Sequence, residues 1–182
     1  RSVGVVPAAV VGHSQGEIAA ACVAGGLSLA DGARVVALRS RAIVALSGSG
    51  GMVSVPAPLD EVQELIVGWG GDLSVAAVNG PAQVVISGTA AACEEFVQAY
   101  AELGVRRIAV DYASHSSQVQ AIRDRLHTDL AGLRPRSGQV PFFSTLEAVL
   151  VDTAGLDGGY WYRNLRHTVR FGEVIRTLTE AG

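Results

Sequence analysis

The stretch Val10-Val11-Gly12-His13-Ser14-Gln15-Gly16-Glu17-Ile18-Ala19-Ala20 decides the fold of this chain. The apolar run from Val3 to Val11 predicts a buried strand, and strong helix formers occupy residues 17–23. Ser14 therefore lies at the apex of a sharp strand-to-helix turn, with a glycine on each side, as in a nucleophile elbow. Glycines are expected there because bulky neighbours would collide with the strand and the helix. We predict that Ser14 is a nucleophile and that the Gln15 N–H, at the helix start, faces a developing oxyanion.

Composition excludes several classes of function. The 182 residues suffice for one domain, with or without an inserted subdomain, and the net charge of −3 with no basic run argues against nucleic acid. Cys22 and Cys93 are too few for a disulfide framework and match no metal spacing, which favours a reducing, cytoplasmic setting. No signal peptide or membrane-spanning stretch is recognisable. Because the chain begins one strand before its predicted nucleophile, we expect it to be a fragment of something longer.

A second helix follows Gly25-Gly26. Ser28, with Asp31 three residues on, predicts a capped start, and the helix is expected to run to about Leu46. Arg39 lies within the apolar file of this helix, which gives two interpretations. Either its guanidinium extends along the boundary to water, or it is a buried cation that would grip a carboxylate with two hydrogen bonds.

The middle of the chain has a different pattern. Strand, helix, strand, strand, helix and strand are predicted at 52–55, 59–67, 73–78, 84–87, 90–103 and 105–110, with a turn at Asn79-Gly80-Pro81. This is the ferredoxin-like order. We predict an α/β fold in which a small ferredoxin-like subdomain, residues 48–111, is inserted into a hydrolase-like, parallel-sheet subdomain formed by residues 1–47 and 112–182.

The rest of the chain returns to the larger subdomain. A helix after His115 has one apolar face, formed by Val119, Ile122, Leu126, Leu130 and Leu133. A strand is predicted at 140–144, a loop at 153–159, and a last helix from Phe171 to Leu178.

A serine nucleophile needs a base within hydrogen-bond reach, and there are four histidines. His13 adjoins Ser14, so the backbone should direct its side chain elsewhere. His127 lies mid-helix beside an apolar position and is expected to be solvated. His167 follows two arginines and is expected on the surface or among the nearby aromatic residues. His115, where the chain re-enters the larger subdomain, is the best placed.

Several motifs occur together and in order: residues 12–20, Arg39, residues 79–81 and 83–88, residues 112–115, Tyr160-Trp161, Asn164-Leu165 and residues 169–171. Over nearly the whole chain this combination resembles the acyltransferase domain of a modular type I polyketide synthase. That domain extends further at both ends.

The resemblance implies a ping-pong reaction without a cofactor bound by the domain itself. Ser14 would attack the thioester of an acyl-CoA extender unit with His115 as base, and the acyl group would pass to the phosphopantetheine thiol of an acyl carrier protein. Arg39 would pair with the free carboxylate of the extender, and the Gln15 N–H would form half of the oxyanion hole. The other half would come from a loop before residue 1, and the group that orients the histidine from a segment after residue 182.

Further implications concern Asn79, the neighbouring domains and the extender. Asn79 matches a position near the acyl-CoA, although turn geometry explains it equally well. A ketosynthase is expected before the domain and a carrier protein after it, in the same polypeptide. Gln15 and the run Tyr112-Ala113-Ser114-His115 match domains that select methylmalonyl-CoA. Small side chains at 113 and 114 would leave room for an α-methyl group, which a phenylalanine at 114 would fill.

Two other functions stay open at this stage. An α/β-hydrolase, either an esterase or a thioesterase, shares the elbow, but its acid and histidine normally follow on late loops, and the only close pair here is Asp111 with His115. A non-catalytic scaffold domain of a megasynthase would have no physical use for Ser14, Arg39 and His115.

Overall fold

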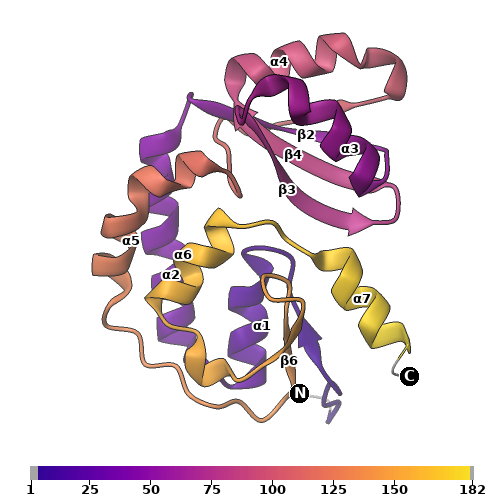
Figure 1. Ribbon diagram of the computed structural model, residues 1–182. Coiled ribbons are helices and arrows are strands. Elements are labelled where there is room, and N and C mark those ends of the chain that lie inside the picture. Colours follow the sequence, from indigo (N-terminus) through magenta and orange to yellow (C-terminus); the bar gives the residue numbers. More distant parts are fainter. Residues whose placement is uncertain (1–3, 181–182) are drawn as a thin grey trace.

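The computed structural model describes residues 4–180, which form two packed units, each with its own sheet (Figure 1). The larger unit has a three-stranded sheet in the order β1-β6-β7, made of Val10–Val11, Phe142–Ser144 and Val149–Val151. β1 and β6 are parallel, whereas β7 returns antiparallel to β6. The α/β class with a smaller second unit is as predicted, and the division at 47/48 and 111/112 stays a prediction.

The first strand is much shorter than predicted. Within the described part of the run 3–11, only Val10 and Val11 pair, while Val5 and Val6 are both 66% exposed. Val3 lies outside the described residues. Pro7 has no N–H to donate to a ladder, so an apolar run alone did not determine how far pairing extends.

The remaining helical elements of the larger unit are α1 Gly16–Ala24, α2 Leu29–Ile43 with the 3₁₀ turn η1 Val44–Leu46, η4 Ser117–Ile122, α5 Arg123–Leu130, η5 Thr153–Gly155, α6 Gly158–Arg166 and α7 Phe171–Glu180. The last of them, α7, packs against β3 of the smaller unit. The predicted cap is present, because Ser28 Oγ accepts a hydrogen bond from the Asp31 N–H at 3.0 Å. All five residues of the predicted apolar face after His115 are buried.

The predicted loop 153–159 was wrong in its last two residues. α6 begins at Gly158, and the Asp157 carboxylate caps it by accepting from the Tyr160 N–H at 2.8 Å. Gly158 is there for close packing. A Cβ at this position would lie 3.1 Å from Leu130 Cβ on α5.

The smaller unit is a four-stranded antiparallel sheet in the order β3-β4-β2-β5. Its elements are β2 Gly50–Val55, α3 Leu59–Ile66, the turn η2 Val67–Trp69, β3 Leu73–Gly80, β4 Gln83–Thr89, α4 Ala90–Ala99, the turn η3 Ala101–Leu103 and β5 Arg106–Ile108. This matches the predicted βαββαβ order. One correction concerns Asn79 and Gly80, which end β3, so that the turn itself falls at residues 81–82.

The sheet of the smaller unit has two differently covered faces. Its outer face packs on α3 and α4 around Val53, Ile86 and Phe96, and its inner face turns toward the segment between α6 and α7 (Figure 1). In that segment Val169 runs parallel to β3, accepting from the Val78 N–H at 2.8 Å and donating to Ala76 O at 2.9 Å. The chain that joins α6 to α7 thus ties the two units together.

Candidate active site

Ser14 lies at the turn between β1 and α1 with a φ of 53°, in the left-handed region that side chains other than glycine rarely adopt. Gly12 is required on one side, because a Cβ there would overlap the backbone of Gly16 and Glu17. Gly16 is not required in the same way: a Cβ would meet nothing within 4 Å, so the steric expectation was wrong at this position. The elbow geometry itself is present.

Ser14 and His115 form a hydrogen-bonded pair, with Oγ 2.8 Å from Nε2. The other ring nitrogen, Nδ1, lies 2.7 Å from the backbone carbonyl of His167. Because a carbonyl can only accept, Nδ1 carries the proton and Nε2 is left to accept the Ser14 proton. The resemblance implied that the group that orients His115 lies after residue 182. The structure has the His167 carbonyl in that role.

The environment of His115 keeps its ring neutral. The residue is 4% exposed, and its pKa is lowered from 6.5 to about 4 by burial first and by the neighbouring Arg39 charge second. At neutral pH the ring is in the form that can remove a proton from Ser14.

Arg39 is buried, at 5% exposure, so the interpretation in which it extends to water is wrong. Its Nη1 donates to Asn164 Oδ1 at 2.7 Å and its Nη2 lies 3.4 Å from Ser14 Oγ. Burial lowers its pKa to about 10, which still leaves the guanidinium charged at neutral pH. Among residues 4–180 no carboxylate lies within ion-pair distance of it.

Sequence reasoning missed a second buried charge, Glu17 on α1, which is 0% exposed. Its carboxylate accepts from Thr145, Tyr160 and Asn164, and burial raises its pKa. Acidic residues are common in the first turn of a helix, where they interact favourably with the helix dipole, so the sequence position of Glu17 does not indicate burial. The signal that could have found it is its spacing from Ala20, Ala21 and Ala24, which places it on the buried face.

The other predicted site residues surround this centre. Gln15 is exposed at the start of α1, and its N–H donates no hydrogen bond within the described part of the chain. Tyr112 packs at the edge of the larger core. Ala113 and Ser114 are buried just before His115, with Ala113 against Gly50.

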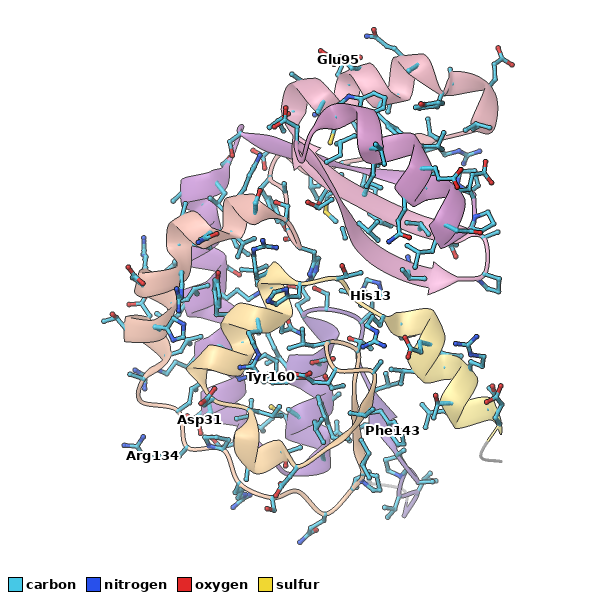
Figure 2. The ribbon with its side chains drawn as sticks, viewed as in Figure 1. His13, Asp31, Glu95, Arg134, Phe143 and Tyr160 are labelled. Atoms are coloured by element: carbon cyan, nitrogen blue, oxygen red, sulfur yellow. The ribbon has the colours of Figure 1, made fainter. Side chains whose placement is uncertain are left out.

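Asn79 is held by His13, whose Nε2–H donates to Asn79 Oδ1 at 2.7 Å, so His13 points away from Ser14 as predicted. Figure 2 shows His13 beneath the smaller sheet, near the start of α7, where its ring lies 5.4 Å from that of Phe171. His127 is exposed, as predicted, with its ring 5.5 Å from that of Tyr162.

The acid considered for a hydrolase triad is not in place. Asp111 accepts from the Ser47 hydroxyl, and the nitrogen of His115 that an acid would bind is occupied by the His167 carbonyl. In the described range 4–180 there is also no group of three His, Cys, Asp or Glu residues suited to a metal ion. Nor does any helix in that range have the length and apolarity to cross a membrane.

Comparison with known proteins places this geometry in a family. The protein-family model described as the acyl transferase domain matches residues 1–182 of this chain. The chain is 62% identical over 185 residues to the spectinabilin polyketide synthase system protein NorA' of Streptomyces orinoci, and 53% identical over 184 residues to the mycoketide-CoA synthase of Mycobacterium tuberculosis. Each match covers the whole of this chain, but only 5% of the length of the first relative and 4% of the length of the second.

Solved structures agree. The acyltransferase domain from module 8 of the salinomycin polyketide synthase is 53% identical, with a TM-score of 0.97, and the match covers all of this chain and 44% of that one. The acyl transferase domain of SpnD, solved in complex with 2-(pent-4-yn-1-yl)malonyl, is 32% identical with a TM-score of 0.88, over 98% of this chain and 43% of that one. An acyl-carrier-protein S-malonyltransferase from Burkholderia pseudomallei is 27% identical, with a TM-score of 0.89. The match covers 100% of this chain and 62% of that one.

Proposed function

Because this chain belongs to the acyl transferase domain family of modular type I polyketide synthases, we propose that it loads a dicarboxylic extender unit, preferably methylmalonyl, from CoA onto Ser14. The acyl group then passes to the phosphopantetheine thiol of an acyl carrier protein. The acyl-CoA is a substrate, and the chemistry needs no cofactor held by this chain.

One observation carries the proposal: Arg39 is a buried cation with a donor 3.4 Å from the Ser14 hydroxyl. In a malonyl-type thioester the free carboxylate and the thioester carbonyl are separated by a single carbon. A carboxylate bound to Arg39 therefore brings the reacting carbonyl to Ser14. Two of the related structures point to the same class of substrate, one named a malonyltransferase and one holding a substituted malonyl group.

The proposed reaction uses the same pair of residues twice. As Ser14 Oγ bonds to the thioester carbon, His115 Nε2 takes the hydroxyl proton, and the Gln15 N–H stabilises the negative charge on the carbonyl oxygen. The intermediate collapses with cleavage of the carbon–sulfur bond, and the proton on His115 passes to the departing CoA thiolate, which leaves as the thiol. The carrier-protein thiol then attacks the ester in the reverse sequence and frees Ser14.

The preference for methylmalonyl rests on the residues just before His115. Ala113 and Ser114 are small and buried where the chain leads to the catalytic histidine. Such residues leave volume next to the α-carbon of a bound acyl group. Since the relatives are far longer than this chain, a ketosynthase and a carrier protein in the same polypeptide are proposed as its neighbours.

Intact mass of the protein after incubation with methylmalonyl-CoA tests the function. We expect a stable methylmalonyl adduct that disappears in Ser14→Ala and persists in Ser28→Ala, which removes a helix-capping hydroxyl outside the site. Steady release of methylmalonic acid in place of the adduct would indicate a hydrolase. Labelling of the Ser14→Ala protein would exclude Ser14 as the nucleophile.

A further inference from the structure

A single neutral side chain separates the two buried charges of the larger unit. Asn164 Oδ1 accepts from Arg39 Nη1 at 2.7 Å, and Asn164 Nδ2 donates to Glu17 Oε2 at 3.0 Å. All three residues are at most 5% exposed. The two ends of the amide cannot be exchanged, because its NH₂ would then face the guanidinium and its oxygen the carboxylate.

The carboxylate end of this arrangement is fixed by donors. Glu17 Oε1 accepts from the Thr145 N–H at 2.5 Å and from its hydroxyl at 2.6 Å, and Oε2 accepts from the Tyr160 hydroxyl at 2.5 Å. Tyr160, labelled in Figure 2, reaches from α6 toward α1.

Behind Tyr160 the hydrogen bonds continue in the same direction. Ser144 Oγ accepts two backbone N–H groups, so its own proton is free to go to the Tyr160 oxygen 2.7 Å away. Burial raises the pKa of Glu17, and this chain, in which every member donates toward the carboxylate, opposes that rise.

The same amide also holds the elbow. Asn164 Nδ2 lies 3.3 Å from the backbone carbonyl of Ser14. Asn164 thus contacts both the cation and the residue that carries the nucleophile, and so it sets the distance between them.

A buried arginine is ordinarily paired directly with a carboxylate. Direct pairing here would occupy the guanidinium donors that a substrate carboxylate needs. The amide takes one N–H group only. Burial lowers the pKa of Arg39, and the interactions with Tyr112 and then with Glu17, one side chain further, partly offset that fall.

We propose that Asn164 and Glu17 are positioning residues that keep Arg39 charged, fixed beside Ser14 and open to the carboxylate of a dicarboxylic acyl group. This inference rests on the proposed function of Arg39.

The decisive variant is Asn164→Asp, which keeps the shape of the side chain but places a carboxyl group on Arg39 and removes the N–H donor to Glu17. In the intact protein, kcat/KM for acyl-enzyme formation is measured with methylmalonyl-CoA and with propionyl-CoA, which differ only by the carboxylate. We expect the ratio of the two values to fall at least tenfold, chiefly through a higher KM for methylmalonyl-CoA. Glu17→Gln, which places an NH₂ among donors, should lower the ratio severalfold.

The matched control is Thr153→Val, which removes two hydrogen bonds of a buried side chain of the larger unit, to Gly138 N and Arg136 O, away from the site. It should leave the ratio unchanged. If Asn164→Asp does not fold, Tyr160→Phe takes its place, because it removes one donor from Glu17 and leaves Asn164 intact. Equal losses for both esters in a folded Asn164 or Tyr160 variant would overturn the positioning role.

The wild-type protein separates this inference from the function beneath it. If it forms no Ser14 adduct, or if Arg39→Ala treats the two esters alike, the proposed function fails and the positioning role falls with it. If the ratio depends on Arg39 but not on Asn164 or Glu17, only the positioning role is wrong.

Discussion

The two units of this chain have cores of different chemical character. The larger core surrounds Glu17, Arg39, His115 and Asn164, all at most 5% exposed, whereas the buried side chains of the smaller unit are apolar apart from Ser87. Burying polar groups costs free energy unless they are hydrogen-bonded. The contrast therefore indicates where side chains are held for chemistry and where they only pack.

Aromatic residues follow the same division. In the smaller unit Trp69, Phe96 and Tyr100 pack ring against ring, with centroids 4.7 to 5.9 Å apart. In the larger unit Tyr160 and Trp161 also use their polar atoms, the first on Glu17 and the second on the Leu156 carbonyl at 2.9 Å. Substitutions of buried side chains in the two cores should therefore differ in what they change, activity in the larger and stability alone in the smaller.

The largest difference is expected between two arginines. Arg39→Ala should cost about 3–5 kcal/mol in kcat/KM with methylmalonyl-CoA, as expected when one partner of a buried charge pair is removed. It should cost far less with propionyl-CoA, which has no carboxylate to bind. Arg107→Ala in the smaller unit removes only an exposed pair with Glu94 and should change neither value. Parallel losses with both esters would make Arg39 a structural residue.

The next effect concerns histidine and pH. The folded pKa of His115, about 4, lies below its ordinary 6.5, so between these values the unfolded chain binds a proton that the folded chain does not. Stability therefore falls as pH falls, by about 3 kcal/mol from this residue between pH 7 and pH 4.

Denaturant unfolding at several pH values measures this loss. His115→Gln should flatten the dependence on pH by that amount. His127→Gln, which removes an exposed histidine of the same unit, is the matched control. The same slope in wild type and His115→Gln would show that the ring is not buried in its neutral form.

How far the sequence could predict all this differs between the two units. The smaller unit follows local patterns: alternating apolar residues, turn residues and helix formers predicted its six elements in the right order. At the site the elbow, Arg39 and His115 were predicted, because an apex serine and a charge in an apolar file are visible as local departures from pattern.

The rest depends on distant contacts. The His167 carbonyl 52 positions from His115, and the Asn164 amide 125 positions from Arg39, are brought into place by the packing of α6 on the larger core. A backbone carbonyl has no sequence signal at all. Asn164 was visible only as part of a family motif, with no role attached.

A smaller change should move substrate choice. Replacing Tyr112-Ala113-Ser114 by His-Ala-Phe fills the volume proposed for the α-methyl group, so the preference should shift toward malonyl-CoA. One methyl group in an apolar pocket is worth about 1–3 kcal/mol, or roughly 10- to 200-fold. Competition of the two CoA esters in one reaction, followed by intact mass of the acyl-enzyme, gives the ratio. A malonyl adduct that dominates in the unmutated protein would contradict the methylmalonyl preference.

The smallest effect compares one substitution in the two cores. Ser87 on β4 is fully buried, and its Oγ has no hydrogen-bond partner within the described residues, whereas Ser144 Oγ bonds Tyr160 and accepts two backbone N–H groups. Ser87→Ala removes a hydroxyl without a hydrogen-bond partner and should stabilise the protein by about 1 kcal/mol. Ser144→Ala leaves the hydrogen-bond partners of Ser144 unsatisfied and should destabilise the protein by about 1–3 kcal/mol. The denaturant concentration at the midpoint of unfolding measures both changes, provided that the dependence of the unfolding free energy on denaturant is the same in each protein. Loading of methylmalonyl should be unchanged in Ser87→Ala. Because the two variants delete the same atom, opposite changes in the free energy of unfolding would show that the surroundings are the cause. A loss of stability in both would show that Ser87 has a hydrogen-bond partner, and it would contradict the contrast between the two cores.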